Sequence, residues 1–210
     1  MSGASINKKL NKAYAKVGKI LGYNFKMYRS LDYMTPVQDK NYLKEVTLAF
    51  SIDESFKKQQ DFSFHLYNLY CDGADIMPGD IFENTDLDKR FTLVQNDPIT
   101  VSLSIDSSDQ ITISRPTYTT TGGFSPKQEI IAANVPATIL EAKAQGYSGN
   151  NTQPTPLKSG IQVWDIWTYL PEDKIRINDV IEDSRGNKST VTSCQLTPLG
   201  YKIITQSTKA

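Results

Sequence analysis

The chain has 210 residues, with 23 basic and 23 acidic side chains that balance to a formal net charge of zero. A chain of this length buries one substantial core or two small ones, and its neutrality provides no overall field that would attract nucleic acid or an anionic membrane. No apolar run approaches the roughly 20 residues that cross a bilayer, and the first residues lack the apolar core of a signal peptide. We therefore expect a soluble protein that is not exported.

Histidine and cysteine usage argues against an enzyme or a metal protein. Most nucleophilic and acid-base schemes place a histidine in a cleft, whereas the single histidine, His65, lies on the polar face of a predicted strand. Cys71 is about 20 Å from His65 along that extended strand, and Cys194 has no second thiol nearby in sequence. P-loop, dinucleotide-binding and nucleophile-elbow motifs are absent from the sequence. We predict that the chain is not an enzyme, has no catalytic residues and binds no metal or cofactor.

The N-terminal segment predicts a basic amphipathic helix over residues 6–21. It carries lysines but no acidic residue before Asp32, and Gly22 stands where a helix commonly ends. Apolar residues recur at steps of three and four, which places them on one helical face. This apolar stripe consists of Ile6, Leu10, Tyr14, Val17 and Leu21.

The apolar stripe is expected to be buried against another surface, and the lysines favour an acidic partner. We therefore predict that residues 1–30 form an arm whose helix docks on another protein chain. A plain solvated lysine face and a contact with nucleic acid or a membrane surface are the alternatives. Arginine, which base-reading contacts prefer, is nearly absent from the helix. We therefore expect neither nucleic acid nor a membrane among the partners.

After the helix, short runs rich in β-branched and aromatic residues predict strands, because turn-forming residues separate them. The predicted strands are 24–29, 43–52, 62–70, 90–95, 99–105, 110–114, 161–169, 174–181, 189–195 and 200–206. Two of them alternate on either side of Ser107, Ser108 and Asp109, and this pattern predicts a hairpin.

Residues 117–160 are rich in Thr, Gly, Asn, Gln and Pro and form the least core-like region. We expect a short helix over 137–145, closed by Gly146, between long loops. Because each ordered backbone residue loses roughly 1–2 kcal/mol of conformational entropy, we expect this segment to be mobile alone and ordered in an assembly. The side chains expected to bury apolar area against a neighbour include Phe124, Ile130, Ile131 and Tyr147.

These elements predict an α+β fold that is predominantly β, with small antiparallel sandwich or barrel units. We divide the chain into a helical arm (1–30), a β region (31–116), a loop-rich assembly segment (117–160) and a C-terminal β region (161–210) that closes the fold. IMPGDIF at 76–82 and IRINDVI at 175–181 share an apolar residue, a turn, an aspartate and two apolar residues. We interpret this short echo as two ordinary β-turn-β units rather than as a duplication.

Several segments together resemble a known group of proteins. They are INDVIEDSRGNKSTVTSCQLTPLGYKIITQ at 177–206, VQNDPITVSLSIDSSDQITISRP at 94–116, GYNFKMYRS after the helix, and the turn Pro78-Gly79-Asp80. Taken in their order along the chain, these segments resemble small virion proteins encoded in the tail-structure region of tailed bacteriophages.

The resemblance implies a structural subunit of a symmetric ring around the tail axis, in the inner baseplate or at the tail end. It implies other tail proteins and copies of the chain itself as partners, and a place in the virion, which is assembled in the host cytoplasm. A head-tail connector is the alternative within this class. A carbohydrate-binding or glycan-degrading β module is the alternative of another class, because Trp164 and Trp167 flank Asp165.

Overall fold

A computed structural model describes residues 3–30, 32–52, 66–71, 75–97, 100–118, 124–141, 161–170 and 174–208. Within these ranges one α-helix at the N-terminus, α1 (Gly3–Leu21), is followed by antiparallel strands and a short 3-10 turn, η1 (Asp39–Asn41). The fold is therefore predominantly β with an N-terminal helix, which confirms the predicted fold class.

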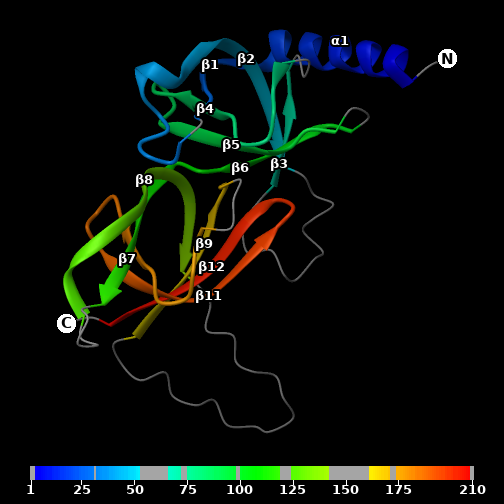
Figure 1. The fold of residues 1–210 in the computed structure, drawn as a ribbon. Coiled ribbons are helices and arrows are strands. Elements are labelled where there is room, and N and C mark those ends of the chain that lie inside the picture. Colours follow the sequence, from blue (N-terminus) through cyan, green and yellow to red (C-terminus); the bar gives the residue numbers. More distant parts are fainter. Residues whose placement is uncertain are drawn as a thin grey trace, which may run out of the picture.

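The strands form two closed six-stranded barrels, one packed against the other (Figure 1). Barrel 1 consists of β1 (Tyr23–Tyr28), β2 (Tyr42–Ile52), β3 (Leu66–Tyr70), β4 (Ile81–Asn84), β5 (Lys89–Gln95) and β6 (Ser102–Asp106). Barrel 2 consists of β7 (Asp109–Tyr118), β8 (Phe124–Glu141), β9 (Ile161–Thr168), β10 (Val180–Asp183), β11 (Lys188–Thr197) and β12 (Gly200–Thr208).

The two barrels have the same strand order. It is β1-β2-β3-β6-β5-β4 in the first and β7-β8-β9-β12-β11-β10 in the second. The pairing registers also correspond: Ile105 of β6 pairs with Leu66 of β3, and Gln206 of β12 pairs with Val163 of β9. The ladder between β5 and β6 has a register shift at the same place as the ladder between β11 and β12. We call residues at the same place in the two ladders counterparts.

The hairpin predicted around Ser107 is wrong. β6 pairs with β3 and β5, whereas β7 pairs with β8 and β10, so the two consecutive strands belong to different barrels. Ser107 is buried, its backbone N–H donates to the carbonyl of Arg90 at 2.8 Å, and its hydroxyl lies 2.7 Å from that of Thr92. These bonds fix the connection to barrel 1, and the chain leaves it to begin barrel 2.

The helix predicted over 137–145 is also wrong in its first part, because residues 137–141 belong to β8 and pair with β9. The rest of that prediction, residues 142–145, lies outside the described residues. Pro136 is tolerated within β8, and its carbonyl accepts a hydrogen bond from the Thr168 hydroxyl at 2.9 Å. Ala137 is fully buried, so this segment contributes to the barrel core instead of a loop.

The predicted segment boundaries differ from the barrels. The arm 1–30 includes β1, which is part of barrel 1, and the β region 31–116 includes most of β7, which is part of barrel 2. The loop-rich segment 117–160 contains β8. Two strands, β4 and β8, are absent from the predicted set, since one has only four residues and the other looked helical.

A shared apolar cluster holds the barrels together. Trp167 of barrel 2 is 1% exposed in this cluster. The cluster consists of Leu66, Val94, Leu103, Ile105, Trp167, Leu140, Tyr169 and Leu199. The segment that follows β1 adds a short parallel bridge, because Thr35 N donates to the carbonyl of Ala133 at 2.8 Å and Ala133 N donates to that of Tyr33 at 2.9 Å. The barrels therefore pack through buried side chains as well as backbone hydrogen bonds.

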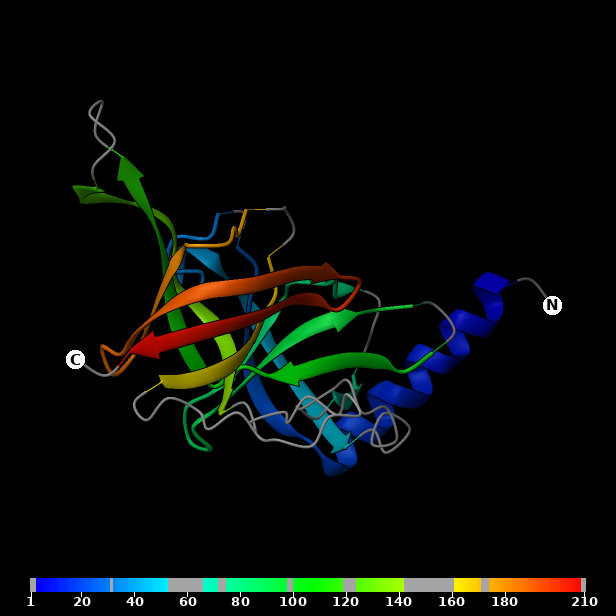
Figure 2. The same cartoon turned by 90° about the horizontal axis from the view of Figure 1, so that it is seen from below.

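Helix α1 packs against β2 and β3 with its C-terminal half, and its N-terminal half extends beyond barrel 1 (Figure 2). The rings of Tyr14 and Tyr70 meet edge to face at 5.9 Å. A Cβ on the buried Gly18 would lie 2.8 Å from the carbonyl oxygen of Tyr70 and 3.0 Å from that of Thr47. The close approach of helix and barrel therefore requires glycine at this position.

We expect Leu103→Ala to destabilise the protein by about 2–5 kcal/mol, because it opens a cavity between the barrels. Ile204, the counterpart in barrel 2, is only partly buried, so the matched control Ile204→Ala should cost less. Urea unfolding followed by tryptophan fluorescence measures both. Equal losses in the two variants would contradict the assigned interface.

Candidate functional site

A buried ion pair lies at the seam where barrel 1 closes. Arg29 follows β1 and Asp80 precedes β4, and these two strands pair to complete the barrel. The guanidinium of Arg29 donates from Nε and Nη2 to both carboxylate oxygens of Asp80, at 2.6 and 2.7 Å. Asp80 has no exposed side-chain surface, and the backbone N–H of Met77 also donates to it at 2.8 Å. Arg29 further donates to the carbonyl of Asp75 at 2.8 Å.

Barrel 2 repeats this arrangement at its own closing seam. Arg115 donates from Nε and Nη2 to Asp179 at 2.8 and 2.9 Å, and from Nη2 to the carbonyl of Lys174 at 2.7 Å. The backbone N–H of Arg176 donates to Asp179 at 2.7 Å. The hydrogen bond to its aspartate is the main cause that raises the pKa of the guanidinium in both arginines.

The turns before the two aspartates match as well. Gly79 and Asn178 each have a positive φ, of 94° and 74°. The N–H of Gly79 donates to the carbonyl of Leu93 in β5, and the N–H of Leu93 donates to the carbonyl of Asp80. In barrel 2, the N–H of Asn178 donates to the carbonyl of Val191 in β11, and the N–H of Val191 donates to the carbonyl of Asp179. The segments 76–82 and 175–181 therefore occupy equivalent places in two barrels of one topology, because the aspartate of each makes the same contacts.

The sequence interpretation missed the two arginines. Each lies one residue beyond the last residue that pairs across the seam, Tyr28 in MYRS and Ser114 in ISRP, and this shared position was the available signal. Their partners lie 51 and 64 residues away. Spacings that differ this much conceal the pairing, because the loops between the strands differ in length.

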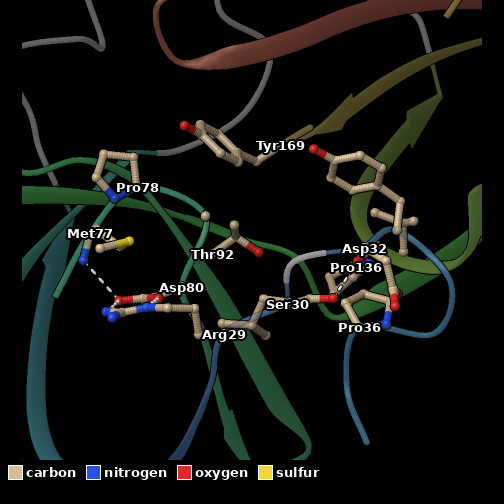
Figure 3. Close-up of a pocket in the computed structure, with 14 residues that line it drawn as sticks. Arg29, Ser30, Asp32, Pro36, Met77, Pro78, Asp80, Thr92, Pro136 and Tyr169 are labelled. Atoms are coloured by element: carbon tan, nitrogen blue, oxygen red, sulfur yellow. Dashed lines mark hydrogen bonds and ion pairs between the residues drawn. The ribbon is translucent and has the colours of Figure 1, made fainter. Parts of the chain in front are cut away.

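A pocket of about 220 Å³ lies between the barrels, beside the first ion pair (Figure 3). Barrel 2 contributes Pro136 and Tyr169, and a Cβ at Gly79 would lie 3.0 Å from the Tyr169 ring. Tyr33 lines another part, and the ammonium of Lys174 lies 4.5 Å from the centre of its ring.

The pocket has apolar walls and a fixed polar side. Pro36, Pro78 and Pro136 line it together with Met77 and the tyrosines. Arg29 engages both oxygens of Asp80, so this carboxylate is held as a hydrogen-bond acceptor on one side of the pocket. Ser30, Asp32 and Thr92 contribute further polar side chains to the lining.

The structure places the predicted stripe of α1 partly on barrel 1. Leu10, Tyr14 and Val17 are half-buried, while Ile6 is 40% and Leu21 is 70% exposed. The stripe is thus neither fully covered by the chain's own core nor fully free. The prediction that it docks on another chain stays a prediction.

Of the four predicted interface residues in the loop-rich segment, Ile130 and Ile131 have described side chains. Ile130 is 51% exposed, and Ile131 packs against the core of barrel 2. Phe124 is the first residue of β8, but its side chain lies outside the described set, as does all of Tyr147. The structure therefore leaves Ile130 as a free apolar side chain and gives Ile131 an internal role.

The residues weighed for chemistry lie apart. His65 is outside the described residues, Cys71 is buried in barrel 1, and Cys194 packs against the core of barrel 2. Trp164 packs against the core of barrel 2, whereas Trp167 lies between the barrels. The two tryptophans therefore occupy opposite faces of β9 and do not form a shared platform for a sugar.

Within the described ranges, no group of three or more His, Cys, Asp or Glu side chains is arranged to hold a metal ion. No helix in this part of the chain has the apolar length that crossing a membrane requires. Comparisons with known protein families, with curated proteins and with solved structures find no match to this chain.

We expect Arg29→Met to destabilise the protein by about 3–5 kcal/mol, because it leaves the buried carboxylate of Asp80 without its partner. Adding Asp80→Asn should recover part of the loss. The control Lys44→Met breaks an exposed pair with Asp75 and should cost about 0–1 kcal/mol. Urea unfolding midpoints measure all three, and an Arg29 variant as stable as the control would contradict the role of the pair.

Proposed function

We propose that the chain is a structural virion protein of a tailed bacteriophage, a ring-forming subunit of the inner baseplate or tail end that joins tail components. The sequence resemblance to tail-region virion proteins supports this function. The structural support comes from two appendages that leave the double barrel on opposite sides, α1 and a two-stranded ribbon (Figures 1 and 2).

The ribbon is the single observation that carries the proposal. It consists of residues 115–118 of β7 and 124–129 of β8, which pair with each other beyond the barrel wall, and Ile130 lies at its base opposite Ser114. β10 pairs with β7 only up to Ser114, and β9 pairs with β8 only from Ala137 onward. A two-stranded ribbon is marginally stable alone and presents unpaired strand edges. A neighbouring subunit stabilises such a ribbon by adding a strand or covering its apolar side chains.

The exposed part of α1 provides the second contact. Ile20 and Leu21 are 68% and 70% exposed, and Ile6 is 40% exposed. Lysines occupy the rest of the helix surface, so an acidic and apolar partner fits it. Appendages on opposite sides produce heterologous contacts, in which different surfaces of neighbouring copies meet. Such contacts close into a ring when the rotation between copies permits it and otherwise continue as a filament.

A head-tail connector is the second candidate, favoured by the exposed lysines of α1 at 8, 9, 12, 16 and 19. Phosphate binding by these side chains would give a salt-dependent affinity for DNA. The glycan module has weaker support, because Trp164 and Trp167 face different cores.

We expect the purified protein to form ring-sized particles whose abundance increases with concentration. Ile130→Glu should strongly reduce the number of ring-sized particles, since it places a charge at the exposed apolar side chain at the base of the ribbon. Leu87→Glu is the matched control, because Leu87 is similarly exposed, at 43% against 51%, but lies on a turn of barrel 1. Mass photometry and negative-stain electron microscopy measure particle size and shape.

Titration calorimetry with glycans and with DNA covers the alternatives. Monomers at every concentration together with heat from a glycan would overturn the proposed function. Salt-dependent DNA binding that is lost when the lysines of α1 are replaced by glutamine would favour the connector.

A further inference from the structure

The contact between the two barrels joins two different faces. Barrel 1 contributes the β3–β6 face, defined by Leu66, Val94, Leu103 and Ile105. Barrel 2 contributes the β8–β9 face, defined by Thr138, Leu140, Trp167 and Tyr169. The contact is therefore heterologous, and each barrel keeps a counterpart of the face that the other barrel uses.

The counterpart in barrel 2 is the β9–β12 face, defined by Val163, Thr192, Ile204 and Gln206. Val163 and Ile204 are partly exposed, while Thr192 and Gln206 are exposed polar residues. In barrel 1, the turn at Gly79 packs beside this contact against Tyr169. The matching turn in barrel 2 exposes Ile177 by 59%. Asp165 pairs with Ile204 and lies on the same side of β9 as Val163, so this face combines apolar and polar side chains. Such a mixed composition is typical of interfaces between separately folded proteins.

The counterpart in barrel 1 is the β2–β3 face, defined by Ala49, Ser51 and Tyr70. Tyr70 pairs with Ala49 as Trp167 pairs with Thr138, so Tyr70 is the counterpart of the buried Trp167. Helix α1 lies on this face, with Tyr14 against Tyr70 and Gly18 against the Tyr70 carbonyl. Helix α1 thus occupies on barrel 1 the position that barrel 1 occupies on barrel 2.

We propose that the β9–β12 face of one copy binds the β2–β3 face of a second copy after α1 has moved off it. The contact between chains then repeats the contact between barrels within a chain. This inference rests on the proposed function, to which it adds the binding faces and a helix that controls access to one of them.

The packing of α1 supports a removable cover. The helix leaves Ile20 and Leu21 largely exposed while it is docked. Tyr14 and Gly18 approach the barrel closely, while the N-terminal half of the helix extends beyond it. A helix that covers a binding face lowers the apparent affinity for the second copy by the fraction of molecules in which the face is free.

Gly18→Leu tests the proposal, because any side chain at this position meets the backbone carbonyls of Tyr70 and Thr47. Leucine forms helices better than glycine, so the substitution removes docking and not the helix. Ala13→Leu, on the exposed side of the same helix, is the matched control. Tyr14→Ala, which removes the ring contact without adding bulk, is a second releasing variant.

If α1 leaves the face free in about 1–10% of molecules, its release lowers the apparent dissociation constant of self-association by about 10- to 100-fold. Mass photometry over a concentration series measures this constant, and circular dichroism checks that each variant is folded. Adding Ile204→Glu to Gly18→Leu should restore the monomer. Adding Leu43→Glu, at a more exposed leucine (48%) on the N-terminal part of β2, should not.

Folded Gly18→Leu and Tyr14→Ala variants that associate no more strongly than Ala13→Leu would overturn the proposal. Assembly that depends on Ile130 but not on Ile204 would overturn these binding faces and leave the proposed function standing. Oligomers that depend on Ile204 but never close into rings would support the faces and count against the proposed function.

Discussion

The fold depends on a buried arginine-aspartate pair that is present once in each barrel. In both cases the pair lies directly beyond the end of the ladder that closes the barrel, between β1 and β4 and between β7 and β10. The aspartate also accepts the backbone N–H three residues before it, which fixes a turn whose third residue has a positive φ. Without the arginine, a carboxylate that is almost fully buried would lack its charge partner, and the turn would lose its anchor. One interaction therefore sets the turn, the start of a strand and the closure of the barrel.

Alternation of apolar and polar residues was sufficient to predict most strands and the helix, because it reports directly which side chains face a core. Predictions from this alternation were wrong where the local sequence favours one structure and contacts with distant residues favour another. Residues 137–141 look helical, since alanine, leucine and glutamate favour helices, yet Ala137 is buried in the wall of barrel 2. Ser107 looks like part of a hairpin turn, yet its bonds to Arg90 and Thr92 hold it to barrel 1. Both errors come from contacts far away in sequence.

The structural correspondence of the two barrels is hard to detect in the sequence because they share residue types at only a few equivalent positions. The ion pair and the residue before its turn persist, as with Ile76 and Ile175, both buried. Outward positions differ between the barrels with their surroundings. Ile105 is covered by barrel 2, whereas its counterpart Gln206 is exposed. The candidate interfaces occupy these differing positions, so a pattern search over the sequence has little to match there.

A heterologous contact has no intrinsic end, since each added unit presents the face that the next unit binds. Two features oppose such continuation in this chain. At one end Thr192 and Gln206 replace the apolar Val94 and Ile105, which weakens the driving force for burial. At the other end α1 covers the face around Tyr70. The polar residues are a permanent feature, whereas α1 is joined to β1 through the single residue Gly22 and its N-terminal half extends beyond barrel 1. The proposed assembly step is therefore controlled at the N-terminal end of the chain, where barrel 2 of a second copy replaces α1 on the β2–β3 face.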